Sequence, residues 1–325
     1  MDRPKIGLAL GGGVARGWAH IGVLRALQAA DIEADIICGT SIGAVVGGCF
    51  LAGKLDELEA WARSLTRLKI MSYLDFHVRM PSLIGGERLI RELEGHLGPV
   101  AIENLPRRFA TVATDLTTGH EVWLHEGPLV EAIRASFSLP GIFPPVLIRN
   151  RWLVDGALVN PVPVSLCVAQ GATLVIAVNL NADLIGKARA SGGDFQASFD
   201  ILEAIEETQP AGVTGLVKRL FRRQPATPSM FGVMTSSLNI VLDRITRSRL
   251  AGDPPDVHIA PKLGHIGIME FDRAAEMIDL GIRATEAALP EIQAAMDALG
   301  MRQNGGSGEA ESAELLTPPA PSRTT

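Results

Sequence analysis

Residues 39–43 read Gly-Thr-Ser-Ile-Gly and follow an apolar run, so that a serine stands between two glycines. In many hydrolases this pattern forms a sharp turn between a strand and a helix, which lifts the serine hydroxyl above the edge of the sheet. Backbone N–H groups at the start of the following helix also favour negative charge there. Ser41 is therefore a candidate nucleophile, with Gly39 and Gly43 permitting the turn. The alternative is a tight turn whose serine only caps a helix.

A second glycine-rich segment, Gly-Gly-Gly-Val-Ala-Arg-Gly at residues 11–17, also follows a short apolar run. It fails as a dinucleotide fingerprint because Arg16 stands where the third glycine should be, and it fails as a P-loop because no Gly-Lys-Ser/Thr follows. Successive glycines at the start of a helix instead expose backbone N–H groups that can hold an oxyanion. The candidate donors are the N–H groups of Gly11, Gly12, Gly13 and Val14. Arg16 could brace this loop or bind a substrate phosphate.

Asp155 is the candidate base, because it follows the predicted strand 151–154 and opens the turn Asp-Gly-Ala at 155–157. A serine is a poor nucleophile until a base takes its proton. A free carboxylate, with a pKa of about 3.9, is a weak base, so burial must raise that pKa. Gly156 belongs to the same turn. The alternative role for Asp155 is that of a simple turn aspartate.

Histidines are the rival bases. A triad in the order Ser, Asp, His would take its histidine from His258 or His265, which both lie downstream of Asp155. The other histidines show no metal-ligand spacing, and surface or core roles are expected for them: His20, His77, His96, His120 and His125. The residues alone leave a dyad and a triad open, and they predict no metal and no cofactor.

The composition limits the class of protein. The 325 residues are 47% apolar and 20% charged, which excludes intrinsic disorder, a disulfide scaffold and a collagen-like repeat. The formal net charge of −6, from 30 basic and 36 acidic residues, argues against a nucleic-acid-binding protein. Cys38, Cys49 and Cys167 are scattered in apolar runs and fit a reducing compartment. The apolar run before Gly11 is too short for a signal peptide, so a cytoplasmic protein is expected.

The elements that must position these residues alternate along the chain. Strands separated by helices predict an α/β fold with a mostly parallel sheet and helices on both faces. The longest apolar stretch, residues 36–53, is interrupted at Gly39 and predicts a strand, a turn and a helix rather than a membrane span. Predicted strands cover residues 5–10, 35–38, 109–114, 121–124, 151–154, 173–178 and 256–260. Predicted helices cover residues 18–28, 42–52, 56–67, 87–96, 129–136, 199–207, 231–250 and 271–288. Pro290 permits one more short helix after the last of these.

The chain is expected to have four parts. Residues 5–180 form the catalytic domain, residues 181–230 an insertion or mobile lid-like segment, and residues 231–302 a helical C-terminal part packed on the same domain. Residues 303–325, rich in Gly, Ser, Glu, Pro and Thr, form a disordered tail. Within the insertion, residues 216–223 (Leu-Val-Lys-Arg-Leu-Phe-Arg-Arg) form a basic amphipathic stretch that either contacts a membrane or is a solvated helix face.

Three ordered blocks resemble a known family. The glycine segment at 11–17, the serine turn at 39–43 and Asp-Gly-Ala at 155–157 look like the signature blocks of patatin-like phospholipases. Residues 113–119, 135–145 and 160–163 resemble blocks of the bacterial branch related to neuropathy target esterase (NTE). The resemblance covers about residues 5–180, with a weaker echo through residues 231–288.

The resemblance implies a three-layer α/β/α fold and a serine lipid acyl hydrolase of the phospholipase A or lysophospholipase type. Ser41 would be the nucleophile and Asp155 the base of a Ser–Asp dyad, with the oxyanion held by residues 11–14. Ala157 stands where glycine is commoner in the family. The implied partner is a lipid or acyl-ester substrate. The basic stretch at 216–223 adds the alternative of peripheral contact at the inner membrane face, and the net charge of −6 predicts no nucleic-acid partner.

Two other classes of function compete with a hydrolase. One is a non-catalytic lipid-binding or regulatory protein that retains the pocket, against which the intact Ser41 and Asp155 argue. The other is a nucleotide-binding protein, which the two failed phosphate-binding patterns disfavour.

Overall fold

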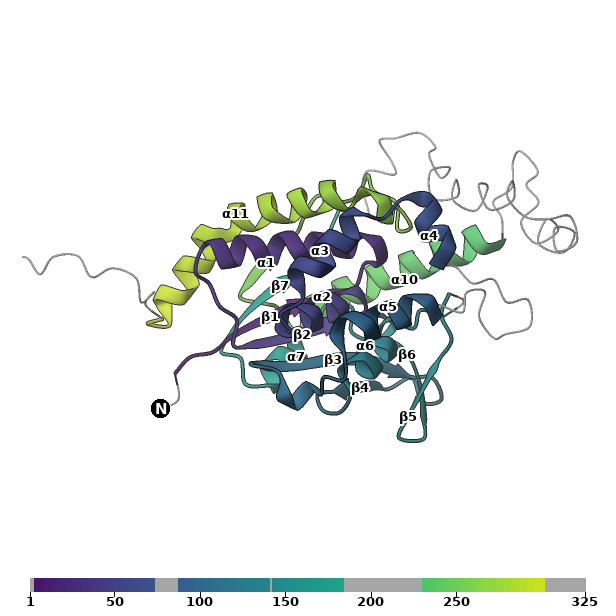
Figure 1. Cartoon of the computed structure of the whole chain (residues 1–325). Helices are drawn as coiled ribbons and strands as arrows, with labels where there is room; N and C mark the ends of the chain where they lie inside the picture. The colour runs from purple at the N-terminus through teal and green to yellow at the C-terminus, as the bar shows by residue number, and fades with distance from the viewer. Residues whose placement is uncertain (1–2, 74–86, 141, 184–229, 302–325) are drawn as a thin grey trace, which may run out of the picture.

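The computed structural model describes residues 3–73, 87–140, 142–183 and 230–301 (Figure 1). Several sequence predictions fall outside the described residues. These are the helix at 199–207, the amphipathic stretch at 216–223, nearly all of the 181–230 insertion, the tail at 303–325, and His77.

A single mixed sheet forms the centre of the protein, in the strand order β5-β6-β3-β2-β1-β7-β8, with β4 paired to β3 off this path. The strands are β1 (Ile6–Leu10), β2 (Ile36–Thr40), β3 (Arg108–Asp115), β4 (Glu121–Leu124), β5 (Val146–Ile148), β6 (Arg151–Asp155), β7 (Leu174–Val178) and β8 (Val257–Ile259). The pairs β1–β2, β2–β3, β1–β7 and β7–β8 are parallel. The pairs β3–β4, β3–β6 and β5–β6 are antiparallel.

Helices cover both faces of this sheet, which confirms the predicted three-layer α/β/α architecture (Figure 1). One face packs against α1 (Ala19–Ala29), α2 (Ile42–Leu51), α3 (Leu55–Arg63), α6 (Leu129–Phe137) and α11 (Ala274–Ala298). The other face packs against α7 (Val164–Ala169), with a contribution from Leu250 in α10 (Met230–Gly252). The remaining described helices are α4 (Arg67–Tyr73), α5 (Glu87–Leu97) and four short 3₁₀ turns, η1 (Val14–Trp18), η2 (Ile102–Asn104), η3 (Gly156–Leu158) and η5 (Phe271–Arg273).

Side chains alternate along each strand, so one strand contributes to the apolar cores on both faces of the sheet. In β1, Leu8 and Leu10 belong to the larger core under α1 and α2, whereas Ala9 faces the smaller core under α7. Side chains point to opposite faces at successive positions, so a strand covered on both sides must be apolar throughout. Each residue of β1 and β7 is buried, as the apolar runs in the sequence indicate.

The register of β3 brings two distant strand ends together. The parallel strand β2 ends with Thr40 opposite Val112, and the antiparallel strand β6 ends with Asp155 opposite Ala113. Val112 and Ala113 are neighbours on β3. Ser41, the first residue after β2, is therefore brought beside Asp155.

The helix that follows the glycine segment packs tightly on α11, the last helix among the described residues. A Cβ on Gly22 of α1 would lie 1.9 Å from the carbonyl oxygen of Ile278, and one on Gly281 of α11 would lie 2.0 Å from that of Ala19. Only glycine allows two backbones to approach so closely. The C-terminal helix is thus held directly against the region that carries the glycine segment.

The helix α11 differs from its prediction, because it runs unbroken from Ala274 to Ala298 through Pro290. The sequence predicted a helix ending at about 288, with Pro290 permitting one more short helix after it. Proline removes one backbone hydrogen bond and costs roughly 3 kcal/mol inside a helix. Pro290 is exposed, whereas Ile292 and Met296 beyond it are buried in the core, and their burial outweighs that loss.

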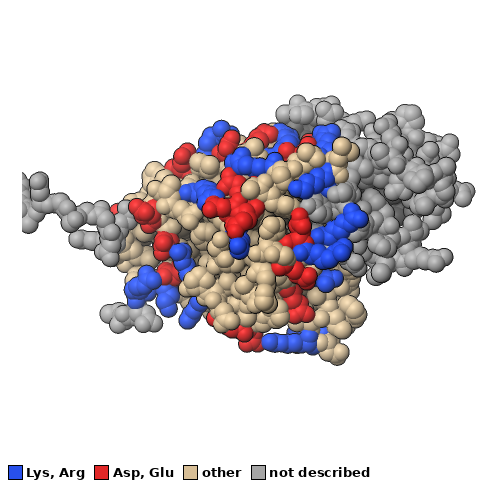
Figure 2. All heavy atoms as spheres, in the orientation of Figure 1, with Lys and Arg blue, Asp and Glu red and all other residues tan. Residues whose placement is uncertain are grey.

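Acidic and basic side chains are interspersed on the face of the protein seen in Figure 2. Among the described residues, no helix has both the length and the apolar character needed to cross a bilayer. The apolar stretch at 36–53 folds as β2, a turn and the buried helix α2, as the sequence predicts.

Candidate active site

Ser41 lies on a strained turn between β2 and α2. Its backbone has φ 57° and ψ −123°, a combination that costs a non-glycine residue of order 1–3 kcal/mol. The Ser41 N–H donates to the Ser136 hydroxyl at 2.9 Å, and that hydroxyl donates to the carbonyl oxygen of Val112 at 2.6 Å. A Cβ on Gly43 would lie 2.1 Å from the carbonyl oxygen of Leu10, so the turn needs glycine there. These contacts hold the serine in place.

The hydroxyl of Ser41 donates a hydrogen bond to Oδ2 of Asp155 at 2.7 Å. The other carboxylate oxygen, Oδ1, accepts the Ala157 N–H at 2.8 Å, and the Asp155 N–H donates to the carbonyl oxygen of Ser138 at 2.9 Å. Asp155 is 1% exposed. Two residues that the sequence nominated separately therefore form one buried pair with a fixed orientation.

Burial raises the pKa of Asp155 to about 6, against the opposing effect of the hydrogen bonds from Ala157 and Ser41. Removing a carboxylate from water disfavours its charged form, whereas donors to that form stabilise it. The carboxylate remains mostly ionised at neutral pH and is a stronger base than a free aspartate. Such a raised pKa is typical of a catalytic base.

The glycine segment lies directly beside this pair. A Cβ on Gly12 would lie 3.3 Å from the Cβ of Ala157 and 3.4 Å from the Cβ of Ser41. The carbonyl oxygen of Gly12 accepts a hydrogen bond from Nδ2 of Asn181 at 3.1 Å. The loop expected to hold an oxyanion therefore faces the candidate nucleophile.

Hydrogen bonds correct the set of candidate oxyanion donors. The Gly11 N–H donates to the carbonyl oxygen of Val178 at 3.1 Å, and the Gly12 N–H donates to that of Pro161 at 2.9 Å. These two N–H groups are occupied, so they anchor the loop to the end of the sheet. The N–H groups of Gly13 and Val14 donate to no other residue in the described part of the chain, and they remain the candidates. Val14 has φ 53°, an unusual value for a β-branched residue.

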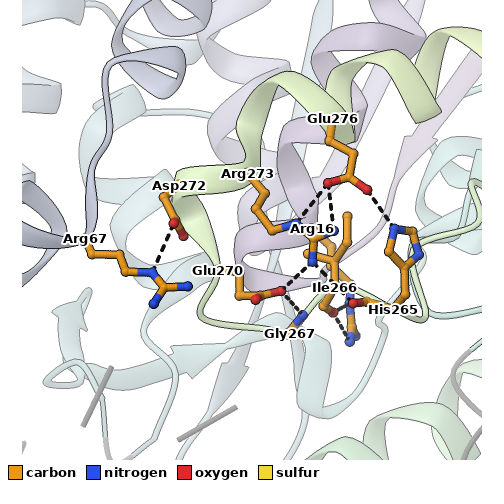
Figure 3. Close-up of polar contacts among 9 residues, drawn as sticks. All are labelled: Arg16, Arg67, His265, Ile266, Gly267, Glu270, Asp272, Arg273 and Glu276. Carbon is orange, nitrogen blue, oxygen red and sulfur yellow. Dashed lines mark hydrogen bonds and ion pairs between the residues drawn. The ribbon is translucent and has the colours of Figure 1, made fainter. Parts of the chain in front are cut away.

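Arg16 braces the loop from behind (Figure 3). Its Nε and one terminal nitrogen donate to the carbonyl oxygen of Ile266 at 2.9 and 2.7 Å, and the Ala15 N–H donates to that of Ile268 at 3.1 Å. Burial lowers the pKa of Arg16 to about 10, although the charges of Asp183 and Glu270 oppose that shift. Arg16 is 5% exposed and does not line the cavity beside Ser41, which favours the bracing role over that of a phosphate ligand.

The segment that receives Arg16 is itself held by ion pairs (Figure 3). Glu270 accepts the Gly267 N–H at 2.7 Å and pairs with Arg273 at 2.9 Å. Glu276 pairs with Arg273 at 2.7 Å and accepts a hydrogen bond from Nε2 of His265 at 2.7 Å. Hydrogen bonds and ion pairs within the segment 265–276 therefore hold in place the backbone that contacts the glycine loop.

His20 supports the same loop, a role that its position in the sequence did not reveal. Its Nε2 donates to the carbonyl oxygen of Gly11 at 2.7 Å, and its ring is fully buried. Burial lowers the pKa of His20 to about 4, so the ring is neutral at physiological pH. Ser136 was also missed, although it lies within the block 135–145 whose resemblance to the family was recognised.

Neither rival histidine lines the cavity beside Ser41, and the Ser41 hydroxyl donates to Asp155 instead. His258 lies on β8, which is separated from β2 by β1 and β7, and three strand spacings amount to about 14 Å. The Nε2 of His265 donates to Oε1 of Glu276 at 2.7 Å. Within the described residues, no group of three or more His, Cys, Asp or Glu side chains is arranged to hold a metal ion.

A cavity of about 160 Å³ opens beside Ser41 and Asp155. Its walls are mainly large apolar side chains from several elements, among them Trp18, Val45, Leu58, Trp61, Phe137 and Phe271. Trp18 contacts Trp61 and Phe271 edge to face, with ring centroids 5.7 and 6.2 Å apart. An apolar cavity with one reactive polar pair suits a substrate that has an apolar chain and one electrophilic group.

The sequence of this chain resembles those of known proteins. Residues 8–168 match the family model of patatin-like phospholipases. An NTE family protein of Mycobacterium tuberculosis is 34% identical, over 89% of this chain and 92% of that protein. A lysophospholipase of Yarrowia lipolytica is 35% identical over 54% of this chain and 12% of that much longer protein. The crystal structure of VipD from Legionella pneumophila shares 12% identity and a TM-score of 0.46, over 89% of this chain and 67% of that one.

Proposed function

Because this chain belongs to the NTE branch of the patatin-like phospholipase family, we propose that it is a serine hydrolase of lipid acyl esters. The observation that carries the proposal is the 2.7 Å hydrogen bond from Ser41 Oγ to the buried carboxylate of Asp155, beside an apolar cavity. The proposed activity is of the phospholipase A or lysophospholipase type and uses a Ser–Asp dyad.

The first half of the reaction forms an acyl-enzyme. Ser41 Oγ attacks the ester carbonyl carbon while its proton passes to Asp155 Oδ2, and the carbonyl oxygen becomes an oxyanion. When the tetrahedral intermediate collapses, the bond to the alcohol breaks and the alcohol takes the proton from Asp155. The fatty acyl group remains on Ser41 as an ester.

Backbone N–H groups hold the oxyanion in this proposal. Gly13 and Val14 offer such groups from the glycine loop, and Ile42 offers one from the first position of α2, where helical N–H groups have no partner within the helix. The Ser41 N–H is not available because it donates to Ser136. The positive end of the α2 dipole adds to the stabilisation of negative charge.

The second half of the reaction regenerates the enzyme. A water molecule attacks the acyl carbon while Asp155 accepts its proton, and the second tetrahedral intermediate forms in the same oxyanion site. Collapse breaks the bond to Ser41 Oγ, which takes the proton back from Asp155 and releases the fatty acid. No step requires a cofactor.

The family and the apolar cavity support a proposal for the substrate and for where the enzyme meets it. A fatty acyl chain matches the apolar walls, and the ester of a phospholipid or lysophospholipid supplies the carbonyl. Such a substrate lies at a membrane surface, so we propose a cytoplasmic enzyme with peripheral contact at the inner membrane face. Cys38, Cys49 and Cys167 are buried free thiols, which is compatible with a reducing compartment.

A fluorophosphonate probe tests the nucleophile, because it reacts with activated serines. The wild-type protein should be labelled and Ser41→Ala should not. Ser138→Ala is the matched control, since Ser138 is buried nearby but its hydroxyl donates to the carbonyl oxygen of Arg134 rather than to Asp155. Equal labelling of wild type and Ser41→Ala would reject the proposed nucleophile. Absence of labelling and of ester turnover would instead favour the non-catalytic lipid-binding alternative.

A further inference from the structure

The cavity beside Ser41 follows one side of helix α2. Ser41, Val45 and Cys49 all line it, and residues four positions apart lie above one another on a helix. With a rise of about 1.5 Å per residue, Val45 lies about 6 Å from Ser41 along the helix axis and Cys49 about 12 Å. The cavity is therefore elongated, and its depth can be read along α2.

The walls along this path are apolar and stiff. Trp61 and Phe271 enclose the indole of Trp18 on one side, and Phe137 and Phe143 meet edge to face on another, with ring centroids 5.3 Å apart. Aromatic side chains in mutual contact have few ways to move aside. A straight, slender chain fits such a passage better than a branched or bulky group.

The lining includes charged side chains near Cys49. The Lys54 N–H donates to the carbonyl oxygen of Cys49 at 2.8 Å, just past the end of α2, and Lys54 and Glu57 both line the cavity. Lys54 Nζ pairs with Glu57 Oε1 at 2.8 Å, and these two side chains are 39% and 43% exposed. A methylene group gains free energy only where it leaves water for apolar surroundings. The gain from lengthening a chain therefore ends near the level of Cys49.

We propose that this cavity is an acyl-chain channel, and that Cys49 marks the depth at which each further carbon of the acyl chain ceases to add to the enzyme's selectivity. The inference rests on the proposed function, since it places the acyl carbonyl at Ser41. A carbon–carbon bond of about 1.5 Å at a near-tetrahedral angle advances an extended chain by roughly 1.3 Å per carbon. The 12 Å from Ser41 to Cys49, taken at about 1.5 Å per residue, then holds about nine or ten carbons.

A bulky substitution should shorten the longest acyl chain that fits, by an amount that depends on where the substituted residue lies along the channel. Cys49 is small and 2% exposed, so a phenylalanine there fills the passage at its apolar end. A phenylalanine at Val45 fills it about 6 Å earlier, which is about five carbons earlier. Blocking at two depths distinguishes a length gauge from general damage to the protein, because damage lowers activity on all chains alike.

The experiment measures kcat/KM for p-nitrophenyl esters with straight acyl chains of two to sixteen carbons. In the wild type, kcat/KM should rise by up to about fourfold per methylene, the equivalent of about 0.8 kcal/mol, and level off near ten carbons. Cys49→Phe should lower the ratio of ten-carbon to four-carbon activity by more than about twentyfold. Val45→Phe should move the cut-off to about five carbons.

Val168→Phe is the control, because Val168 is 57% exposed on α7, on the opposite face of the sheet, and its chain-length profile should match the wild type. A wild-type profile that keeps rising to sixteen carbons, or the same profile in all the variants, would overturn the inference. If Cys49→Phe does not fold, the wild-type plateau and Val45→Phe still decide.

Failure of the proposed function is recognised separately. A wild type that hydrolyses no ester and takes no fluorophosphonate label would reject the hydrolase itself. In that case the Ser41→Ala protein can be titrated with straight-chain fatty acids of six to sixteen carbons. Affinity that increases to about ten carbons and then levels would support the channel without catalysis, whereas affinity independent of length would reject it.

Discussion

Residues 6–180 supply every side chain for which we propose a chemical step, whereas residues 230–301 reach the site mainly through backbone carbonyls and apolar side chains. Ser41, Asp155 and the glycine loop belong to the first region, and the family model matches within it. The second region contributes the carbonyl oxygens of Ile266 and Ile268, which hold Arg16 and Ala15.

This difference explains which region can be read from a sequence. A serine between glycines, or an aspartate after a buried strand, indicates a catalytic role even when only the sequence is known. A carbonyl oxygen is present in every residue, so the sequence around Ile266 gives no sign that it braces the glycine loop. Reactive side chains can therefore be predicted from sequence motifs. Backbone groups that support the site can be identified only from the structure.

We expect that removing the base Asp155 lowers turnover by orders of magnitude, whereas removing the histidines of residues 230–301 has little effect. Asp155→Asn keeps the shape of the pair but cannot accept the serine proton, and turnover should fall by about 10⁴-fold, as expected for a lost member of a catalytic triad. His258→Ala and His265→Ala should keep kcat/KM within about tenfold, which corresponds to roughly 1.4 kcal/mol.

Steady-state kinetics on a short-chain ester give these values, and circular dichroism checks that each variant is folded. The comparison between the two regions would break if either histidine variant were folded and as inactive as Asp155→Asn. A base would then come from the C-terminal region, and the mechanism would be a triad.

Loss of the contact between Arg16 and the carbonyl oxygen of Ile266 should have the next largest effect on catalysis. Arg16→Ala leaves the buried carbonyl of Ile266 without its donor and frees the glycine loop, and a misplacement of about 1 Å near reacting atoms can cost about 10²-fold. The decrease should appear in kcat more than in KM, because the oxyanion forms only in the transition state.

Arg16→Lys restores the positive charge but not the two-pronged contact, so it should recover only part of the loss. Arg63→Ala is the control, since Arg63 is an arginine of α3 that forms an ion pair with Glu59 and lies outside the brace. Full activity in Arg16→Ala would show that the C-terminal support is dispensable for catalysis.

The order of strands and helices was predictable from the sequence because apolar runs and turn residues mark most elements. One short strand and two short α-helices were missed. β5 has only three residues and is joined to β6 through Arg149 and Asn150, which both adopt positive φ without a glycine to announce the turn. The seven-residue α4 and six-residue α7 are too short to show a helical period.

The candidate site was predictable as a set of residues but not as a set of contacts. The distance between Ser41 and Asp155 depends on how β2 and β6 each pair with β3, and no local pattern fixes that register. The same holds for the oxyanion donors. Gly11 and Gly12 look equivalent to Gly13 in the sequence, yet the carbonyls of Val178 and Pro161 occupy their N–H groups.

The pH dependence of the reaction tests whether Asp155, in residues 6–180, is the base. Burial raises the pKa of Asp155 to about 6 in the free protein, so kcat/KM should fall by about tenfold for each pH unit below that value. A histidine base would give a limb near 6.5, which is too close to decide alone. The acid limb should persist in His258→Ala and His265→Ala, and its loss in either one would contradict Asp155.

Stability should change with pH in the same range but in the opposite sense. The raised pKa means that the native state holds this proton more tightly than the unfolded chain. The resulting stabilisation is fully present below the unfolded pKa of about 3.9 and is lost as the pH rises through about 6. Asp155→Asn should therefore gain stability relative to the wild type between pH 4 and 7.5, by up to about 3 kcal/mol in denaturant titrations.

The smallest expected effect concerns a second link between the regions, through Arg249 of α10. Arg249 donates to Glu121 at 2.5 Å and to the carbonyl oxygen of Val159 at 2.9 Å. Glu121 also accepts Nδ2 of Asn160 at 2.8 Å, and the carbonyl oxygen of Asn160 accepts the hydroxyl of Thr40, the residue before Ser41, at 2.9 Å. A chain of hydrogen bonds thus runs from α10 to the serine turn, but it ends on backbone that β2 already holds in the sheet.

Arg249→Gln should therefore lower stability more than it lowers catalysis. The lost contacts are partly exposed, so we expect a decrease of about 1–2 kcal/mol in the free energy of unfolding and at most a fewfold decrease in kcat. Arg244→Gln, on an exposed position of the same helix, should change stability by less than about 0.5 kcal/mol. A double-mutant cycle with Glu121→Gln measures the link, because a coupling energy near zero would mean that α10 does not stabilise the first region through this pair. A large loss of kcat in Arg249→Gln, with stability unchanged, would instead make the C-terminal region a positioning element for Ser41 and remove the division between chemistry and support.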